Sequence, residues 1–259
     1  MIQESNDFET LIDNLRPVDD TFFHKLVEQK EFCEELLQVL LEKPDLKIVD
    51  FTPQKSLRNV KGKSIIMDLL CKDIENKHYN IEIQRFDNDN HQKRVRYNGS
   101  NIDTYITEKG IPYTKLPDVY VIYISEFDVF KKQKAIYHID RIIRETHDIV
   151  DNGYTEIYIS TSIQDDSDIS ELMQIFKSKN IPNNTKFSNI CKTIKYFKIG
   201  KGRQDMCKLM EEYKAKWQEE EKLNILFDLV NDKILTIEEA SKRADLTPDE
   251  FTEKFHQQN

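Results

Sequence analysis

Two short apolar runs flank a polar turn over residues 64–85, and this is the clearest pattern in the chain. The first run covers residues 65–70 and the second covers residues 79–84. The turn between them is rich in Asp, Glu and Asn, so the segment is predicted to be a β-hairpin. Polar and apolar residues alternate along the second run, which puts Glu82 and Gln84 on the same face of the strand.

The rest of the pattern predicts further helices and strands. Helical spacing of apolar residues indicates helices over residues 20–42, 89–107, 168–179 and 203–229. Short β-rich runs indicate strands over residues 46–51, 119–124, 135–143 and 154–161. The run 119–124 is almost wholly apolar, which is typical of a central strand that is covered on both faces. The expected caps are Asp19 or Asp20 for the first helix and Asp87 or Asn88 for the second.

The two ends of the chain have a different character from the middle. Residues 1–17 indicate a loosely helical lead-in, and residues 18–230 hold most of the apolar pattern. In residues 231–259, two Thr-x-x-Glu sequences begin at Thr236 and Thr247 and predict capping boxes for two short helices. Two short helices joined by a tight turn resemble a helix-turn-helix fragment, but the second is acidic and would bind DNA poorly. We therefore expect a small helical C-terminal appendage that serves docking or dimerisation.

The predicted hairpin carries two carboxylates on neighbouring strands. Asp68 is the only charge in its aliphatic run, and burying it would be costly without a partner cation or a metal ion. Together with Glu82 it offers the oxygen ligands that Mg²⁺ prefers. Alternatively, these acids lie on the solvent face of a half-covered sheet. A shift of one residue in register would also place them on opposite faces.

The spacing D-(x13)-E-x-Q, formed by Asp68, Glu82 and Gln84 and followed by a basic helix, resembles the PD-(D/E)XK nuclease superfamily. More narrowly, it resembles the recombination-promoting nuclease and PD-(D/E)XK transposase family of bacteria, over roughly residues 18–235. The stretch from Asp20 to Leu26 and the strand 119–124 match in order. The resemblance implies an α/β fold with a restriction-endonuclease-like core, in which helices flank a mixed central β-sheet.

The resemblance also implies an active site. Asp68, Glu82 and the Ile83 carbonyl would hold Mg²⁺, for which Mn²⁺ or another divalent cation can substitute. Gln84 stands where most of the superfamily has a lysine, so the missing positive charge must come from elsewhere. Arg94 is the first candidate for that charge.

Four further residues are candidates for the same site. Lys93 or Arg96 are the second choice for the missing charge, and Tyr97 shares a helix face with Arg94. Asp20 either lies near the site or simply caps its helix. His24 has no metal-ligating partner at a suitable spacing, so we interpret it as an ordinary residue.

The composition indicates in which cellular compartment the protein is expected. No apolar run approaches the roughly 20 residues of a membrane helix, and the polar, acidic N-terminus is unlike a signal peptide. The four cysteines are scattered, which favours reduced thiols in the cytoplasm.

The net charge is −9, yet there is no acid between Leu172 and Gln204. This window predicts contacts with the DNA backbone, and a solvated lysine-rich surface is the alternative. Its candidate DNA-binding residues are Lys192, Lys195, Lys198, Lys201 and Arg203.

Taken together, these features predict a Mg²⁺-dependent DNA endonuclease of a mobile element or recombination system. Cutting both strands of a duplex favours a symmetric pair of sites, so a homodimer is also expected. Two alternatives stay open. One is a weak or inactive nuclease fold that binds DNA or protein, and the other is a structural or oligomerisation protein.

Overall fold

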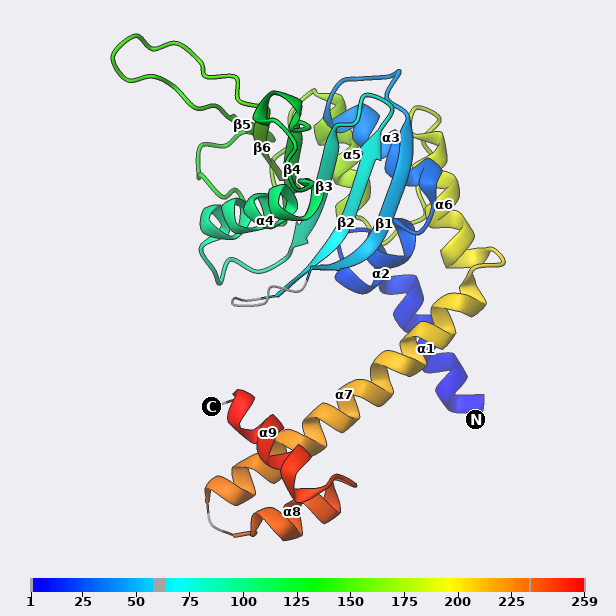
Figure 1. Cartoon of the computed structure of the whole chain (residues 1–259). Coiled ribbons are helices and arrows are strands. Elements are labelled where there is room, and N and C mark those ends of the chain that lie inside the picture. Colours follow the sequence, from blue (N-terminus) through cyan, green and yellow to red (C-terminus); the bar gives the residue numbers. More distant parts are fainter. Residues whose placement is uncertain (1, 58–63, 233, 259) are drawn as a thin grey trace. The chain divides into compact units, whose positions relative to one another are not determined.

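The structure is a computed structural model that describes residues 2–57, 64–232 and 234–258 (Figure 1). The chain divides into two compact units. The first comprises Met1–Glu9 with Gln204–Asn259, and the second comprises Thr10–Arg203. The second unit holds the sheet and every residue predicted for the active site.

A six-stranded mixed sheet with the strand order β1-β2-β3-β4-β6-β5 forms the centre of the larger unit. Its strands are β1 (Ile48–Leu57), β2 (Ile65–Asp73), β3 (His78–Gln84), β4 (Val119–Ser125), β5 (Ile136–Ile139) and β6 (Tyr154–Ser160). β3, β4 and β6 run parallel to one another, and the other neighbouring pairs are antiparallel. The predicted α/β class with a mixed central sheet is therefore confirmed.

The predicted hairpin is formed by β2 and β3, and Asp73 organises its turn. Its Oδ1 atom accepts hydrogen bonds from the backbone N–H groups of Glu75 and Lys77, each at 2.9 Å. Asn76 adopts a positive φ of 64°, a conformation that asparagine tolerates better than most residues. The turn fixes the pairing register, and the register fixes which side chains lie opposite each other.

Helices cover both faces of the sheet (Figure 1). One face is covered by α4 (His91–Ile106), which connects the parallel strands β3 and β4. The other face is covered by α3 (Lys30–Leu40), α5 (Asp168–Lys177) and α6 (Ser188–Ile199), with α2 (Asp20–Leu26) below them in the view. Contacts between the rings of Phe23, Phe32 and Phe176 join α2, α3 and α5.

The single helix predicted over residues 20–42 is wrong, because the segment forms two helices, α2 and α3. A turn at Val27–Gln29 separates them. The buried residues Val27 and Phe32 are five positions apart, which does not fit the helical period. One straight helix over residues 20–42 would therefore not bury the apolar residues of its first and second halves on the same side. The break lets α2 take a direction of its own, which brings His24 to Asp68 on β2.

Other elements also differ from the sequence predictions, and the strand predicted over 46–51 is found as β1 over Ile48–Leu57. Asn90 caps α4, because its side chain accepts a hydrogen bond from the Lys93 backbone N–H at 3.0 Å, in place of Asp87 or Asn88. The strand predicted over 135–143 is shortened to β5. The basic window contains α6, for which no element was predicted.

The smaller unit contains most of α7 (Arg203–Asn231), the first part of α1 (Ile2–Asn14), α8 (Ile237–Arg243) and α9 (Pro248–Gln258). A small core of Leu226, Phe227, Ala240 and Phe251 holds α7, α8 and α9 together. Both predicted capping boxes are present, since Glu239 and Glu250 each exchange hydrogen bonds with the threonine three residues earlier. Among the helices that the structure describes, none has the length and apolar composition needed to cross a bilayer.

Candidate active site

Asp68 and Glu82 lie on adjacent strands at the point where the β2–β3 ladder ends. The last ladder pair is Leu69 with Ile81, and one further step of the register sets Asp68 opposite Glu82. The Asp68 Oδ2 atom accepts a hydrogen bond from the Ile83 backbone N–H at 2.8 Å. The carboxylate thus bonds β3 directly at the end of the ladder.

Glu82 is a buried carboxylate, with a side chain that is only 1% exposed. Its Oε1 atom accepts a hydrogen bond from Asn80 Nδ2 at 2.8 Å, whereas Oε2 has no hydrogen-bond partner within the described part of the chain. Burial, and then the negative charge of Asp68, raise the pKa of Glu82 well above its ordinary value. A cation placed between the two acids would relieve both effects.

Arg94 reaches this pair from α4. Its Nη2 atom lies 3.5 Å from Glu82 Oε2, and Nη1 donates a hydrogen bond to Gln84 Oε1 at 2.8 Å. The other end of the Gln84 amide donates to the Phe86 carbonyl oxygen at 2.8 Å. Gln84 therefore uses both ends of its amide, and one of them holds the arginine beside Glu82.

A cavity of ≈ 450 Å³ opens beside Glu82. Lys93, Arg94 and Tyr97 line it from α4, and Ile66 lines it from β2. Arg96 does not, because it lies on the other flank of α4 and lines a different cavity. The structure thus brings Lys93 and Tyr97 to the candidate site and separates Arg96 from it.

Helix α2 brings two more side chains to Asp68. His24 Nε2 lies 3.0 Å from Asp68 Oδ1, although the sequence gave no reason to place His24 at the site. Burial, and then the charge of Asp68, raise the pKa of Asp20. Asp20 and His24 are four residues apart and share a helix face, and this spacing was the only signal in the sequence that links them.

A ring of four charged residues fixes α2 against the strand ends. Asp19 lies 2.8 Å from Arg16 and 3.2 Å from Arg85, measured between side-chain nitrogen and oxygen atoms. Glu126 completes the ring, at 2.5 Å from Arg16 and 3.1 Å from Arg85. Since Arg85 follows Gln84 directly, these ion pairs hold the start of α2 beside the end of β3.

The side chains predicted to bind DNA lie apart from this site, on α6 and just after it. Lys192, Lys195 and Lys201 are exposed. The prediction that Lys198 contacts DNA needs correction, because its side chain is only 1% exposed. It donates hydrogen bonds to the carbonyl oxygens of Asp13 and Lys179. Arg203 pairs with Asp13 at 2.7 Å. The acid-free window therefore includes one lysine that has an internal structural role.

The donor set at the end of the hairpin fits a hard divalent cation. Asp68 and Glu82 supply carboxylate oxygens, and Glu82 Oε2 is a buried acceptor with no hydrogen-bond partner among the described residues, although Arg94 Nη2 lies 3.5 Å away. Over residues 2–57, 64–232 and 234–258, no cluster of three or more His, Cys, Asp or Glu side chains has an arrangement that could hold a metal ion. Two carboxylates with water and phosphate oxygens are nevertheless sufficient for Mg²⁺.

A mixed sheet with helices on both faces and a pair of acids at the end of a hairpin defines a restriction-endonuclease-like nuclease fold. The family model described as PD-(D/E)XK nuclease family transposase matches residues 19–162, which is more than half of the chain. The chain belongs to this family, as its sequence pattern predicted. The family supports a nuclease, a hydrolase for which DNA is the implied substrate. Comparisons with the curated proteins and with the solved structures gave no match.

Proposed function

We propose that the chain is a Mg²⁺-dependent DNA endonuclease that serves a mobile element or DNA recombination. The observation that carries this proposal is the buried Glu82 carboxylate, which has one oxygen without a hydrogen-bond partner and faces the charge of Asp68. Keeping such a group buried and ionised is costly unless a cation compensates it. The Arg94 guanidinium, 3.5 Å from Glu82 Oε2, compensates this charge only in part, since burial and Asp68 still raise the pKa of Glu82. A metal ion would complete the compensation, which supports a metal-dependent nuclease.

Each nearby residue has a proposed role. Asp68, Glu82 and the Ile83 carbonyl would hold Mg²⁺, which when bound lowers the pKa of a water molecule and neutralises charge on the scissile phosphate. Arg94 donates hydrogen bonds to the phosphate oxygens as their charge increases, and so supplies the charge that Gln84 lacks. Gln84 orients Arg94 through their 2.8 Å hydrogen bond.

Four other side chains near the two acids have supporting roles in this proposal. Lys93 attracts the phosphate backbone at the mouth of the cavity, and Tyr97 forms its wall. His24 orients Asp68 through their 3.0 Å contact, and Asp20 lies near enough to Asp68 for their charges to interact. Arg96 has no role in this mechanism. The exposed Lys192, Lys195 and Lys201 contact the DNA backbone.

Nicking of supercoiled plasmid in Mg²⁺ or Mn²⁺ tests the proposal. Asp68→Ala and Glu82→Ala are both expected to abolish nicking while circular dichroism shows a retained fold. Asp50→Ala, which removes an exposed acid from β1 of the same sheet, is the matched control and should leave nicking unchanged. Wild-type nicking by either active-site variant would refute the assignment.

The second candidate function is a DNA- or protein-binding module without catalysis. One observation favours it: His24 already occupies an oxygen of Asp68, and Arg94 already lies beside Glu82. This alternative predicts salt-sensitive DNA binding with no cleavage in any divalent metal. Location in the cytoplasm and assembly as a homodimer stay predictions from the sequence.

A further inference from the structure

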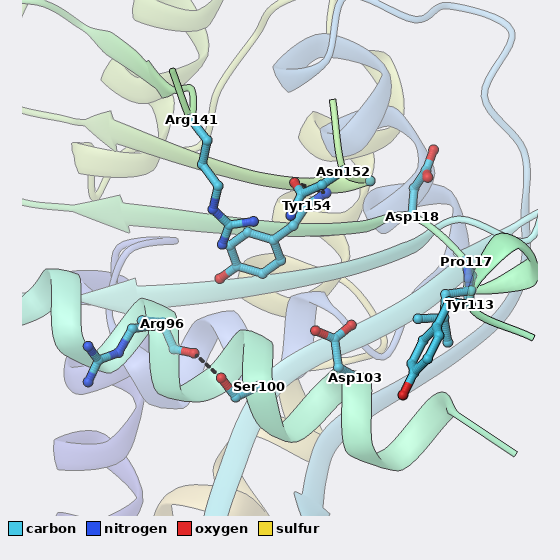
Figure 2. Close-up of a pocket in the computed structure, with 11 residues that line it drawn as sticks. Arg96, Ser100, Asp103, Tyr113, Pro117, Asp118, Arg141, Asn152 and Tyr154 are labelled. Carbon is cyan, nitrogen blue, oxygen red and sulfur yellow. Dashed lines mark hydrogen bonds between the residues drawn. The ribbon is translucent and has the colours of Figure 1, made fainter. Parts of the chain in front are cut away.

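A second cavity lies on the other flank of α4 and has no assigned role (Figure 2). Its volume is ≈ 410 Å³, within the range of about 300–1,000 Å³ that is usual for small-ligand sites. Ser100 and Asp103 line it from α4, and Tyr154 lines it from the start of β6. Tyr113 lines it from a short 3₁₀ helix, Tyr113–Lys115, that precedes β4. None of its lining residues lines the cavity beside Glu82.

A carboxylate and a guanidinium face this space without pairing. Within the described residues, the side chains of Asp103 and Arg141 make no hydrogen bond or ion pair. They are nevertheless close enough for the charge of Arg141 to lower the pKa of Asp103, against the larger effect of burial, which raises it. Figure 2 shows the Asp103 carboxylate directed from α4 into the space below Arg141. The pocket therefore offers the two carboxylate oxygens of Asp103 as acceptors on one side and the guanidinium N–H groups of Arg141 as donors on the other.

Aromatic rings form two further walls. The Tyr154 hydroxyl donates to the Val95 carbonyl oxygen at 3.4 Å, and Arg141 lies 4.9 Å over the ring. A Cβ atom at Gly99 would lie only 2.3 Å from the Tyr154 hydroxyl oxygen, so α4 needs glycine there to admit the ring. Tyr113 is 91% exposed, which leaves its ring open as a stacking surface.

We propose that this pocket binds an unpaired guanine base. Guanine presents two N–H donors, at N1 and N2, which match the Asp103 carboxylate. It presents acceptors at O6 and N7, which match a bidentate arginine such as Arg141. Adenine has an acceptor at N1 and cannot give two donors to a carboxylate. A flat base can also stack on Tyr113, as bases do on exposed aromatic side chains.

The position of the pocket links it to the nuclease site. Val119 pairs with Tyr154 in one row of the sheet, and Tyr123 pairs with Glu82 in another, four residues further along β4. The two rows are about 13 Å apart along the strands. We therefore infer that the guanine belongs to the substrate strand and lies a few nucleotides from the cut. This inference rests on the proposed function and adds a substrate preference to it. A free guanine nucleotide would satisfy the same contacts.

Binding without metal tests the pocket separately from catalysis. Guanosine 5′-monophosphate and adenosine 5′-monophosphate are titrated into the full chain by calorimetry. We expect the guanine nucleotide to bind at least about tenfold more tightly, as one bidentate base contact provides. Asp103→Asn and Arg141→Ala should each remove this preference, and Glu108→Gln, an exposed change just beyond α4, should keep it. Equal binding of the two nucleotides, or an unchanged preference in either variant, would overturn the proposal.

A second arm distinguishes the source of the guanine. Oligo-dT carrying one central dG is compared with plain oligo-dT in the Asp68→Ala background, which cannot cleave by the proposed mechanism. Tighter binding of the dG strand that is lost with Asp103→Asn identifies DNA as the source. Tight guanosine 5′-monophosphate binding without any gain from dG identifies the free nucleotide. Either result supports the guanine pocket, and neither depends on whether the chain cleaves DNA.

Discussion

His24 Nε2 lies 3.0 Å from Oδ1 of Asp68, so a helix that precedes the sheet in sequence reaches an acid of the β2–β3 hairpin. The other oxygen of Asp68 accepts a hydrogen bond from the Ile83 N–H. Both carboxylate oxygens are therefore held by identified groups. Partners of this kind orient a metal-binding carboxylate and adjust its affinity for the metal.

His24→Ala should weaken the apparent affinity for Mg²⁺ by about 10- to 100-fold, the usual cost of losing an outer partner of a ligand. The measurement is the Mg²⁺ dependence of nicking, together with Mg²⁺-induced change in melting temperature. His24→Gln, which keeps a hydrogen-bond donor, should recover part of the loss. His138→Ala removes an exposed histidine from β5 and serves as the control. An unchanged Mg²⁺ dependence in His24→Ala would show that this contact does not orient Asp68.

Arg94→Ala should lower kcat by about 10²- to 10³-fold, as expected when one donor to a transition-state charge is removed. Arg94→Lys should restore only part of this loss, because an ammonium group cannot contact Gln84 and Glu82 at once in the way that a guanidinium does. Steady-state nicking rates measure both effects. Arg144→Ala, at an exposed position, is the control. Full activity in Arg94→Ala would indicate that Lys93, and not Arg94, supplies the positive charge that Gln84 lacks.

The raised pKa of Glu82 predicts how stability depends on pH. Between its ordinary value of 4.5 and its folded value, the folded protein keeps a proton that the unfolded chain has lost. The metal-free free energy of unfolding should therefore fall as pH rises through this window, by at most about 1.4 kcal/mol per pH unit from this group. Urea unfolding of the wild type and of Glu82→Gln from pH 5 to 9 tests this, because the glutamine variant should lose that slope.

The same proton competes with the metal. Because Mg²⁺ binds ionised carboxylates, its apparent affinity should increase with pH until Glu82 is fully ionised. Titrations that follow the Mg²⁺-induced change in melting temperature at several pH values measure this trend. A flat profile would indicate that Glu82 is already ionised in the metal-free protein.

Lys198→Ala should destabilise the fold by about 2–4 kcal/mol, because it leaves the carbonyl oxygens of Asp13 and Lys179 without their buried donor. Lys195→Ala, on the exposed side of the same helix, should change stability by less than about 0.5 kcal/mol. It should instead weaken DNA binding and reduce the salt slope by about 1. Urea unfolding and salt-dependent binding separate the two roles. Equal stability of the two variants would contradict the internal role of Lys198.

Local patterns predicted the centre of this fold well. The alternation in residues 79–84 and the apolar run 119–124 lie on β3 and β4, since strand formation follows from side-chain periodicity and burial. The capping boxes at Thr236 and Thr247 are present because they involve only residues three apart. The break between α2 and α3 was missed, because no Gly or Pro marks it and only the change of phase in the apolar pattern reveals it.

The sequence by itself determined the hairpin, the spacing of Asp68, Glu82 and Gln84, and membership of the PD-(D/E)XK nuclease transposase family. These features depend on residues that are close in sequence or on the order in which the motifs follow one another along the chain. Only the tertiary structure decided which distant side chains meet. It brought His24 to Asp68, buried Lys198, and set Asp103 and Arg141 around one pocket. Such contacts depend on how helices pack across the sheet, and packing directions cannot be read from spacing along a single chain.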